Sequence, residues 1–151
     1  MEYVFRLFIK SIYLINFIKY KFLFKSSNFF YLRAKPTIVG LKMISLGESF
    51  FANRFLRMEV YGDNSKVKIT IGDNVSVGQN VHIGVNNNVR IMDNVLIGSN
   101  VLITDHNHGS YTGEQQDSPF EAPALRKLTS TGHVIINKNV WIGDGVVILP
   151  N

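Results

Sequence analysis

Two histidines stand close together in the segment Asp105-His106-Asn107-His108-Gly109. Histidine is the side chain best suited to take up a proton near neutral pH, which is what the activation of a hydroxyl nucleophile requires. Asp105 could orient either imidazole ring through a carboxylate hydrogen bond. The segment is therefore a candidate for general-base chemistry, with both His106 and His108 open as the base, and a solvated loop tip as the alternative interpretation.

The histidine pair opens a long segment without a regular pattern. A six-residue period runs up to Ile103 and resumes near Val134, so that residues 104–133 have the composition of a loop. Loops of this length in compact domains are usually either functional or disordered. We expect a protruding loop whose histidines are positioned by a rigid scaffold.

The scaffold is predicted by the six-residue period itself. Seven hexads begin with Ile or Val, at positions 71, 77, 83, 91, 97, 136 and 142. Their fourth residue is Asn, or Gly in the last hexad, and their fifth is Val in all but one. Asn and Gly tolerate the left-handed backbone region, and Val and Ile favour short strands. Three such corners predict one triangular coil of about eighteen residues, stacked into a β-solenoid.

A β-sandwich is the competing all-β architecture. It would need strands spaced about eight to twelve residues apart with alternating faces, and this pattern has neither. Before Ile71 the period is ragged: residues 46–55 are predicted to form a first coil capped by aromatic side chains, and residues 61–65 a turn that leads to a strand at 66–70.

Four hexads, IGDNVS, VGQNVH, IGSNVL and IGDGVV, resemble the hexapeptide-repeat left-handed parallel β-helix of the acyltransferase superfamily, over about residues 40–151. The left hand comes from this resemblance. The segments ITDHNHGSYTG and NVWIGDGVVILPN are similar, more narrowly, to bacterial surface-polysaccharide sugar O-acetyltransferases, relatives of the maltose, galactoside and streptogramin acetyltransferases. The resemblance implies transfer of an acetyl group from acetyl-CoA to a sugar hydroxyl, a homotrimer with sites between subunits, and no metal.

The resemblance also implies roles on the acceptor side of the reaction. His108 matches the family's catalytic histidine and would act as general base without a covalent acyl-enzyme, with His106 as the alternative base. His106 and Asn107 would otherwise bind the acceptor, His82 would line its pocket or be an ordinary surface histidine, and Asn53 resembles an acceptor-contacting asparagine. His133 is assigned no role.

On the thioester side the resemblance implies a channel for acyl-CoA beside the single tryptophan, Trp141. Gly143 would allow a pantetheine arm to approach closely. The main-chain N–H of Asp144 would stabilise the oxyanion of the tetrahedral intermediate. Trp141 could also pack against a neighbouring subunit, and the two roles are compatible.

Two other functions are considered beside the enzyme. One is a non-catalytic β-helix that serves as a scaffold or trimer partner, and the other is a His-x-His metal site that resembles the γ-class carbonic anhydrases. The chain has no cysteine, which excludes a disulfide framework and a thiolate nucleophile. It also lacks the motifs of serine hydrolases, P-loop enzymes and Rossmann dehydrogenases.

The N-terminal third carries most of the positive charge. Residues 1–60 contain ten Lys/Arg and three Asp/Glu, whereas residues 61–151 contain six and eight. This argues against a nucleic-acid groove on the folded domain and for an anionic partner of the N-terminus. On a helix, Arg6, Lys10, Lys21 and Lys25 fall in one arc and Lys19 does not fit. We expect a helix that lies on an anionic membrane through residues 1–32, or one that packs on protein.

The predicted organisation is an arm at residues 1–36 followed by a β-helix at 37–151 that includes the loop 104–133. Because the sequence stops at Pro150-Asn151 within a coil, we expect the β-helix to be incomplete at this end and the chain to be a truncated, weak or inactive form. Within residues 3–24 the longest stretch without a charge, Ser11–Ile18, is far short of the ~20 residues of a membrane span. The expected location is the cytoplasm, with peripheral attachment to the inner face of the plasma membrane as an option.

Overall fold

A computed structural model describes residues 2–21, 24, 29–34, 36–62, 66–130 and 132–150. It begins with the helix α1 (Glu2–Lys21), and most of the remaining elements are short strands in three sheets. The β7 face consists of β1 (Phe30–Leu32), β4 (Phe50–Ala52), β7 (Ser76–Val77), β10 (Leu96–Ile97) and β15 (Trp141–Ile142). The β8 face consists of β2 (Thr37–Val39), β5 (Arg57–Val60), β8 (His82–Val85), β11 (Leu102–Thr104) and β16 (Val147–Ile148). The β9 face consists of β3 (Ile44–Leu46), β6 (Ile69–Ile71), β9 (Val89–Ile91) and β14 (Val134–Ile136).

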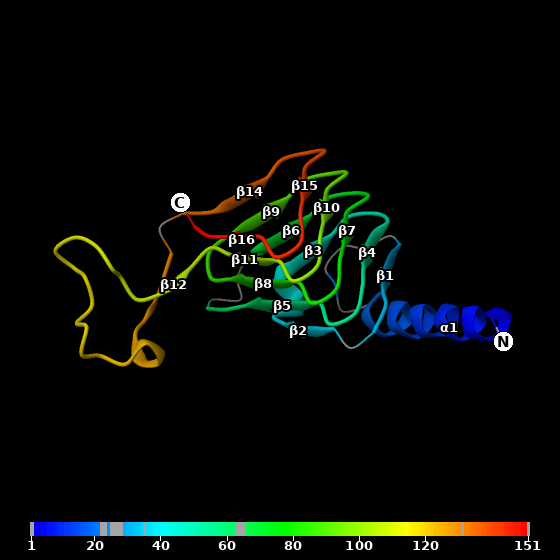
Figure 1. The fold of residues 1–151 in the computed structure, drawn as a ribbon, viewed down its shortest axis with the longest axis horizontal. Coiled ribbons are helices and arrows are strands. Elements are labelled where there is room, and N and C mark those ends of the chain that lie inside the picture. Colours follow the sequence, from blue (N-terminus) through cyan, green and yellow to red (C-terminus); the bar gives the residue numbers. More distant parts are fainter. Residues whose placement is uncertain are drawn as a thin grey trace.

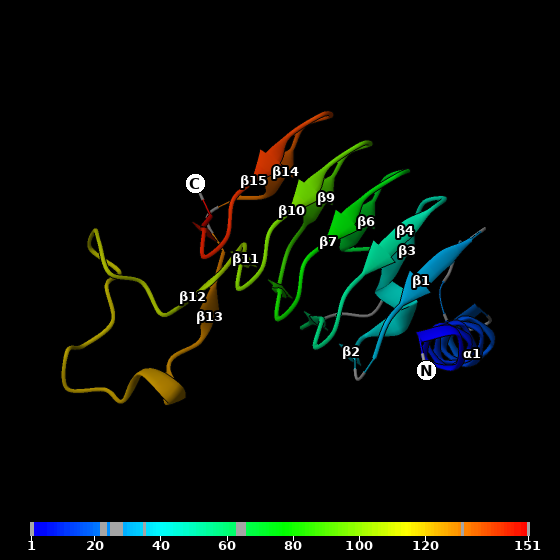
Figure 2. The same ribbon diagram turned by 45° about the vertical axis from the view of Figure 1, so that its right-hand side comes forward.

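Within each face the strands pair in parallel, one coil above the next. Figures 1 and 2 show the coils stacked side by side, with α1 at one end and a long loop projecting from the other. These are the stacked parallel sheets of the left-handed parallel β-helix that the sequence predicts, and the predicted fold class is confirmed.

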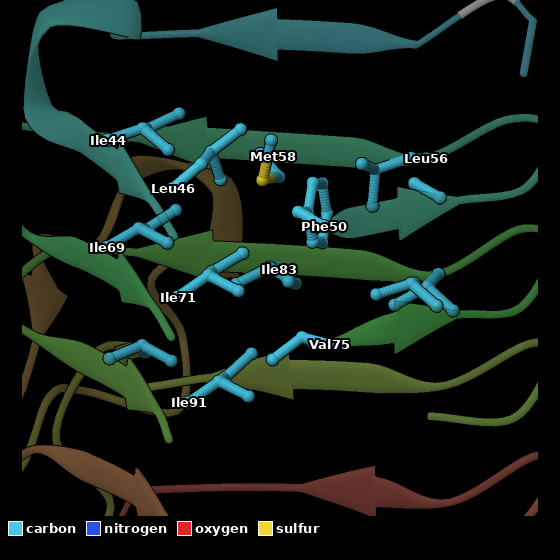
Figure 3. Close-up of a cluster of buried hydrophobic side chains, with 14 of the residues drawn as sticks. Ile44, Leu46, Phe50, Leu56, Met58, Ile69, Ile71, Val75, Ile83 and Ile91 are labelled. Carbon is cyan, nitrogen blue, oxygen red and sulfur yellow. The ribbon is translucent and has the colours of Figure 1, made fainter. Parts of the chain in front are cut away.

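The hexad isoleucines and valines form the core because alternate strand residues point inward. In the β9 face, Ile44 stands beside Ile69 and Ile69 beside Val89, and all three are fully buried. Figure 3 shows this stacking, in which a residue of one coil lies over the corresponding residue of the next. Each coil buries its apolar side chains only against its neighbours, as a solenoid requires.

The predicted corners are confirmed in the regular coils. The fourth hexad residues Asn74, Asn80, Asn94, Asn100 and Asn139 have φ between 55° and 61°, and Gly145 has φ 72°. The side-chain amides of successive coils also bond to one another, as from Asn80 Nδ2 to Asn100 Oδ1 at 2.8 Å. Asparagine therefore supplies both the left-handed backbone and a stacking contact.

The predicted coil length of about eighteen residues is wrong for the central coils. Leu96 pairs with Ser76, twenty residues earlier, and Leu102 pairs with His82 at the same offset. The additional residues lie in the corner between β8 and β9, at 86–88, where Asn86 is not among the residues with positive φ. This corner is built differently from the others, and the candidate site lies beside it.

The β-helix also begins earlier than the predicted boundary at residue 37. β1 pairs with β4, and its residues Phe30 and Leu32 are buried although they fall in the predicted arm. α1 packs on this first coil: Asn16 Nδ2 donates to Leu32 O at 2.7 Å, and the rings of Tyr13 and Tyr31 meet edge to face. No helix among the described residues is long and apolar enough to cross a membrane. Lys25 and most of the predicted turn, residues 63–65, lie outside the described residues.

The predicted loop has a folded structure of its own. Its strands β12 (Asn107–His108) and β13 (Leu128–Thr129) pair antiparallel at the base, and a 3-10 turn, η2 (Pro123–Leu125), lies on the returning arm shortly before β13. The Arg126 guanidinium donates to the carbonyls of Ser118 and Glu121 at 2.9 and 2.8 Å. The loop is thus an ordered projection at the point where the solenoid repeat stops.

Candidate functional site

Three adjacent strands of the β8 face bring polar side chains together on its outer surface. The register places Glu59 of β5 beside Gly84 of β8, and Gly84 beside Thr104 of β11. Two positions earlier, Arg57 stands beside His82. Because the intervening residues of these strands point into the core, the polar ones gather on one patch of surface.

Glu59 is the centre of the first half of this cluster. Its Oε2 accepts from Arg57 Nη2 at 2.7 Å and from the Tyr61 hydroxyl at 3.0 Å, and it lies 2.9 Å from His82 Nε2. Burial alone would raise the pKa of Glu59, but the hydrogen bonds from Arg57 and Tyr61 outweigh it, so that the pKa lies below its usual value. Glu59 is therefore an ionised acceptor.

The surroundings of His82 favour its neutral form. Burial and the positive charge of Arg57 lower the pKa of His82 below its ordinary value, and the attraction of Glu59 does not reverse this. Since the Glu59 carboxylate can only accept, the neutral ring that bonds to it carries its hydrogen on Nε2 and its lone pair on Nδ1.

Gly84 separates the two histidine rings of the cluster. A Cβ atom at this position would lie 3.3 Å from His82 Nε2 and 3.4 Å from His106 Cε1. A side chain at residue 84 would therefore press on both rings. The glycine leaves the space between them open.

His106 is the more firmly fixed of the two histidines singled out by the sequence. Its Nδ1 lies 3.1 Å from Thr104 Oγ1 and 3.2 Å from Asp105 Oδ1, and its ring meets that of Tyr61 edge to face at 5.5 Å. Its side chain is only 10% exposed. A hydrogen on Nδ1, donated toward the carboxylate, leaves the lone pair on Nε2.

Asp105 does more than orient a ring. Its side chain is fully buried, and its two oxygens accept the main-chain N–H groups of Asn86, Asn87 and Asn88 at 2.7, 2.7 and 2.6 Å. The carboxylate therefore replaces the left-handed asparagine at this corner. The predicted contact with an imidazole is made to His106. No hydrogen bond joins Asp105 to His108 in the described part of the chain.

His108 is exposed on β12, at the base of the loop. Its carbonyl accepts the Tyr111 hydroxyl at 2.8 Å, but its ring has no hydrogen bond within the ranges that the structure covers. Asn107, beside it, pairs with Thr129 of β13 and is half-buried. The two predicted bases thus differ: the His106 ring is oriented and nearly buried, and the His108 ring is accessible.

Asn53 is held by its own surroundings. It lies at the corner after β4, where its Oδ1 accepts from Arg33 Nη1 at 3.3 Å and from the Arg54 N–H at 2.9 Å. Nothing among the described hydrogen bonds connects it to the histidines. The structure therefore gives Asn53 a local structural contact and does not bring it together with the cluster.

The residues expected on the thioester side lie on the last described coil. Trp141 is 78% exposed and stands in line with Leu96 and Ser76 on the β7 face. A Cβ atom at Gly143 would meet nothing within 4 Å, because no further coil follows it among the described residues. The side chain of Asp144 accepts the Ser99 N–H at 2.6 Å, so the carboxylate links two coils.

Sequence reasoning missed Arg57, Glu59, Tyr61, Gly84 and Thr104. The offset from β5 to β8 is twenty-five residues, because Arg57 pairs with His82, and no six-residue period can reveal it. Alignment of residues 57–60 (RMEV) with residues 82–85 (HIGV) as equivalent strands would have placed Arg57 beside His82 and Glu59 beside Gly84. In the described residues no group of three or more His, Cys, Asp or Glu side chains could hold a metal ion.

Comparisons with known proteins bear on the fold and the family of the chain. No family profile matches the sequence. Over 108 residues, 71% of this chain, the sequence is 40% identical to WbbJ of Escherichia coli K12, named as an O-acetyl transferase of lipopolysaccharide biosynthesis. The chain spans about half the length of this curated relative, 53%.

The fold is similar to that of AntD, an N-acyltransferase from Bacillus cereus. A point mutant of AntD in complex with dTDP and coenzyme A matches 90% of this chain and 68% of its own, with a TM-score of 0.67 and 21% identity. AntD with dTDP and 3-hydroxybutyryl-CoA matches with a TM-score of 0.61 and 22% identity, over 93% of this chain and 71% of its own.

The fold of the chain is a hexapeptide-repeat β-helix similar to that of AntD. Together with the likeness to WbbJ, this similarity supports the hexapeptide-repeat acyltransferase superfamily that the sequence resembles.

Proposed function

We propose that the protein transfers an acyl group from acyl-CoA to a hydroxyl of a sugar in a surface polysaccharide or its precursor. The observation that carries this proposal is the histidine cluster at the exit of β11, on a β-helix similar in sequence to WbbJ. The AntD complexes hold coenzyme A or 3-hydroxybutyryl-CoA together with dTDP, which supports an acyl-CoA donor and a sugar-linked acceptor. Acetyl-CoA is the donor we propose.

In the proposed mechanism His108 is the general base. Its exposed ring takes the proton of the acceptor hydroxyl while the hydroxyl oxygen attacks the thioester carbonyl carbon. The tetrahedral intermediate then collapses, the C–S bond breaks, and the imidazolium returns the proton to the departing thiolate. The transfer is direct, and no bond to the protein forms.

His106 and His82 are proposed to hold the acceptor. His106 is fixed through Nδ1, so its Nε2 lone pair can accept from a second sugar hydroxyl. His82 is fixed through Nε2, so its Nδ1 can do the same. Glu59 and Asp105 thus act on the acceptor through the rings that they position. Asn107 is the remaining acceptor contact that we propose.

The donor is proposed to lie beside the exposed Trp141, with its pantetheine arm passing Gly143 and the oxyanion bound by the Asp144 N–H. Trp141, at 78% exposed, lies on the β7 face and the histidine cluster on the β8 face. We therefore propose that the site is completed between subunits of a homotrimer, and that the exposed loop residues Phe120 and Leu125 contact a neighbouring subunit.

The test follows the release of free thiol from acetyl-CoA in the presence of a panel of sugars and cell-surface glycans. We expect acceptor-dependent release that His108→Ala lowers about 10²- to 10⁴-fold in kcat, with little change in the KM for acetyl-CoA. His106→Ala should act mainly on the acceptor KM. His133→Ala, an exposed histidine outside the cluster, is the matched control and should leave turnover unchanged. Thiol release no faster than the uncatalysed rate with every acceptor would overturn the proposal in favour of a non-catalytic scaffold.

A further inference from the structure

The helix α1 has two apolar faces. One packs on the protein, and of the other only Leu14, at its edge, reaches a hollow that Phe29 and Tyr31 also line. The inner face of α1 packs on the first coil: Tyr20 is buried, Ile9, Ile12 and Tyr13 are half-buried, and Asn16 donates to Leu32 O. Tyr20 also stacks on Phe24, whose ring meets Phe30 of the core. Packing on the β-helix therefore accounts for one side of α1.

The opposite side of α1 carries a continuous set of exposed apolar side chains, which we call the outer face. Its members are Val4, Leu7, Phe8, Leu14, Ile15 and Ile18, each between 49% and 69% exposed. At 100° per residue they fall within an arc of about 120°, and of the residues within that arc only Ser11 is polar. An apolar face of this kind on a surface helix indicates a partner that covers it.

Positive charges border the outer face along both edges. Arg6, Lys10 and Lys21 lie along one edge, and Lys19 lies along the other. Lys19, which did not fit the arc expected from the sequence, is explained by this second edge. The sequence of α1 contains a single acidic residue, Glu2.

We infer that α1 lies in the interface of an anionic lipid bilayer, with its outer face toward the acyl chains and the basic edges at the headgroups. Lysine and arginine stems reach sideways from an apolar face, so that their charged ends stay at the headgroup level. A second copy of α1 is the less suitable partner, because it would bring edges of the same charge together. The charge pattern thus selects an anionic surface.

The position of α1 is compatible with this docking. The helix lies at the end of the β-helix next to β1, and its N-terminal part extends beyond the strands, whereas the loop projects from the opposite end (Figures 1 and 2). A bilayer against the outer face leaves the loop and its histidines directed away from the membrane. The proposal therefore does not depend on the acyl-transfer chemistry.

The first test is sedimentation of the protein with vesicles of phosphatidylcholine alone or mixed with phosphatidylserine. We expect binding to the mixed vesicles at low salt that weakens as salt is added. Removal of charge in Arg6→Gln/Lys10→Gln/Lys19→Gln should lower the partition coefficient about fivefold per residue. The control Lys42→Gln/Arg54→Gln/Lys66→Gln removes three exposed charges elsewhere and should retain binding.

The apolar contribution is tested by Val4→Ser/Phe8→Ser/Ile15→Ser, which keeps the inner face intact. We expect this variant to lose vesicle binding at the same thermal stability. The control Phe55→Ser/Ile135→Ser removes two apolar side chains of the β-helix that are 49% and 47% exposed, and it should bind as the parent does. Equal binding to both kinds of vesicle, or equal loss in the control variants, would contradict docking through α1.

Insertion is distinguished from self-association by fluorescence. With Phe8→Trp as the only tryptophan, in a Trp141→Phe background, we expect a blue shift on adding mixed vesicles and none with phosphatidylcholine alone. Sedimentation equilibrium without lipid reports association of copies. If the apolar variant abolishes a self-associated state and the parent shows no vesicle-dependent shift, the outer face is an interface between copies and the inference is wrong.

Discussion

The chain turns two corners of the same β-helix in different ways. At Asn80 the chain turns through the left-handed backbone region, and the amide bonds to Asn100 in the next coil. At residues 86–88 the turn is wider, and the buried Asp105 carboxylate from the next coil accepts three N–H groups. The regular corner needs only its own coil sequence, whereas the wide corner needs the start of the loop. The loop histidines are therefore tied to the scaffold at the place where the repeat fails.

Asp105→Ala should destabilise the wide corner more than any other substitution proposed for the β-helix. The substitution leaves three main-chain N–H groups at the corner without their acceptor, and we expect a loss of about 3–5 kcal/mol in the free energy of unfolding. Urea denaturation measures it. Asp73→Ala is the matched control, because the Asp73 carboxylate is exposed and accepts the Glu48 N–H at the edge of a regular coil. A loss at Asp105 no larger than that at Asp73 would mean that the wide corner does not depend on the carboxylate.

Gly84→Val tests the space between the histidine rings. The added side chain would displace both rings from positions only 3.3 and 3.4 Å from its Cβ. We expect turnover to fall about 10²-fold, the effect of an ångström-scale misplacement, with the circular dichroism spectrum unchanged. The turnover of Gly84→Ala should lie between that of the parent and that of Gly84→Val. Full turnover in the valine variant would show that the rings do not touch the acceptor.

Two glycines at the same hexad position provide a finer contrast. At Gly98 a Cβ atom would lie 2.7 Å from the Asp144 N and 2.8 Å from the Gly143 carbonyl carbon, so Gly98→Ala should cost about 1–3 kcal/mol. Gly143 has no such neighbour among the described residues, because it lies on the last described coil. Gly143→Ala should leave the melting temperature unchanged and raise the KM for acyl-CoA. An unchanged KM would remove Gly143 from the proposed donor channel.

The smallest expected effect concerns pH. Native His82 has a lowered pKa, so the unfolded state binds more protons just below the ordinary histidine value, and stability must fall as the pH drops through that range. Glu59 adds a loss of the same sign at lower pH, because its pKa is also lowered. Melting temperatures between about pH 7.5 and about pH 5.5 isolate the histidine. His82→Gln should flatten this dependence, and an equally steep curve in the variant would assign the effect to another group.

Much of the fold could be predicted because it repeats. The Ile and Val positions specify the stacked core, and asparagine at the fourth position specifies the regular corners, as at Asn80 and Asn100. The twenty-residue coil follows from the eight-residue interval between the hexads that begin at Ile83 and Ile91, which a strict six-residue period overlooks. The wide corner depends on Asp105, a residue that lies outside the hexads.

The candidate site was predicted only in part, for a related reason. Histidine is a candidate general base in any sequence because it can take up a proton near neutral pH, so His82, His106 and His108 were identified. Glu59 was not, because its approach to His82 depends on a register across a long, irregular coil. The side of α1 that packs on the β-helix also could not be predicted, because it is determined by contacts such as that of Asn16 with Leu32, which a helical pattern does not reveal.

The role of His108 as general base is tested most directly by the pH dependence of kcat/KM for acyl transfer in the parent, His108→Ala and His106→Ala proteins. We expect kcat/KM of the parent to fall at acid pH, where a protonated imidazole can no longer accept the hydroxyl proton. This acid limb should vanish in His108→Ala and persist in His106→Ala. If the limb vanishes in His106→Ala and His108→Ala keeps most of the turnover, the oriented ring is the base and the two roles are reversed. If neither substitution slows the reaction, the general-base mechanism at the break in the repeat is wrong.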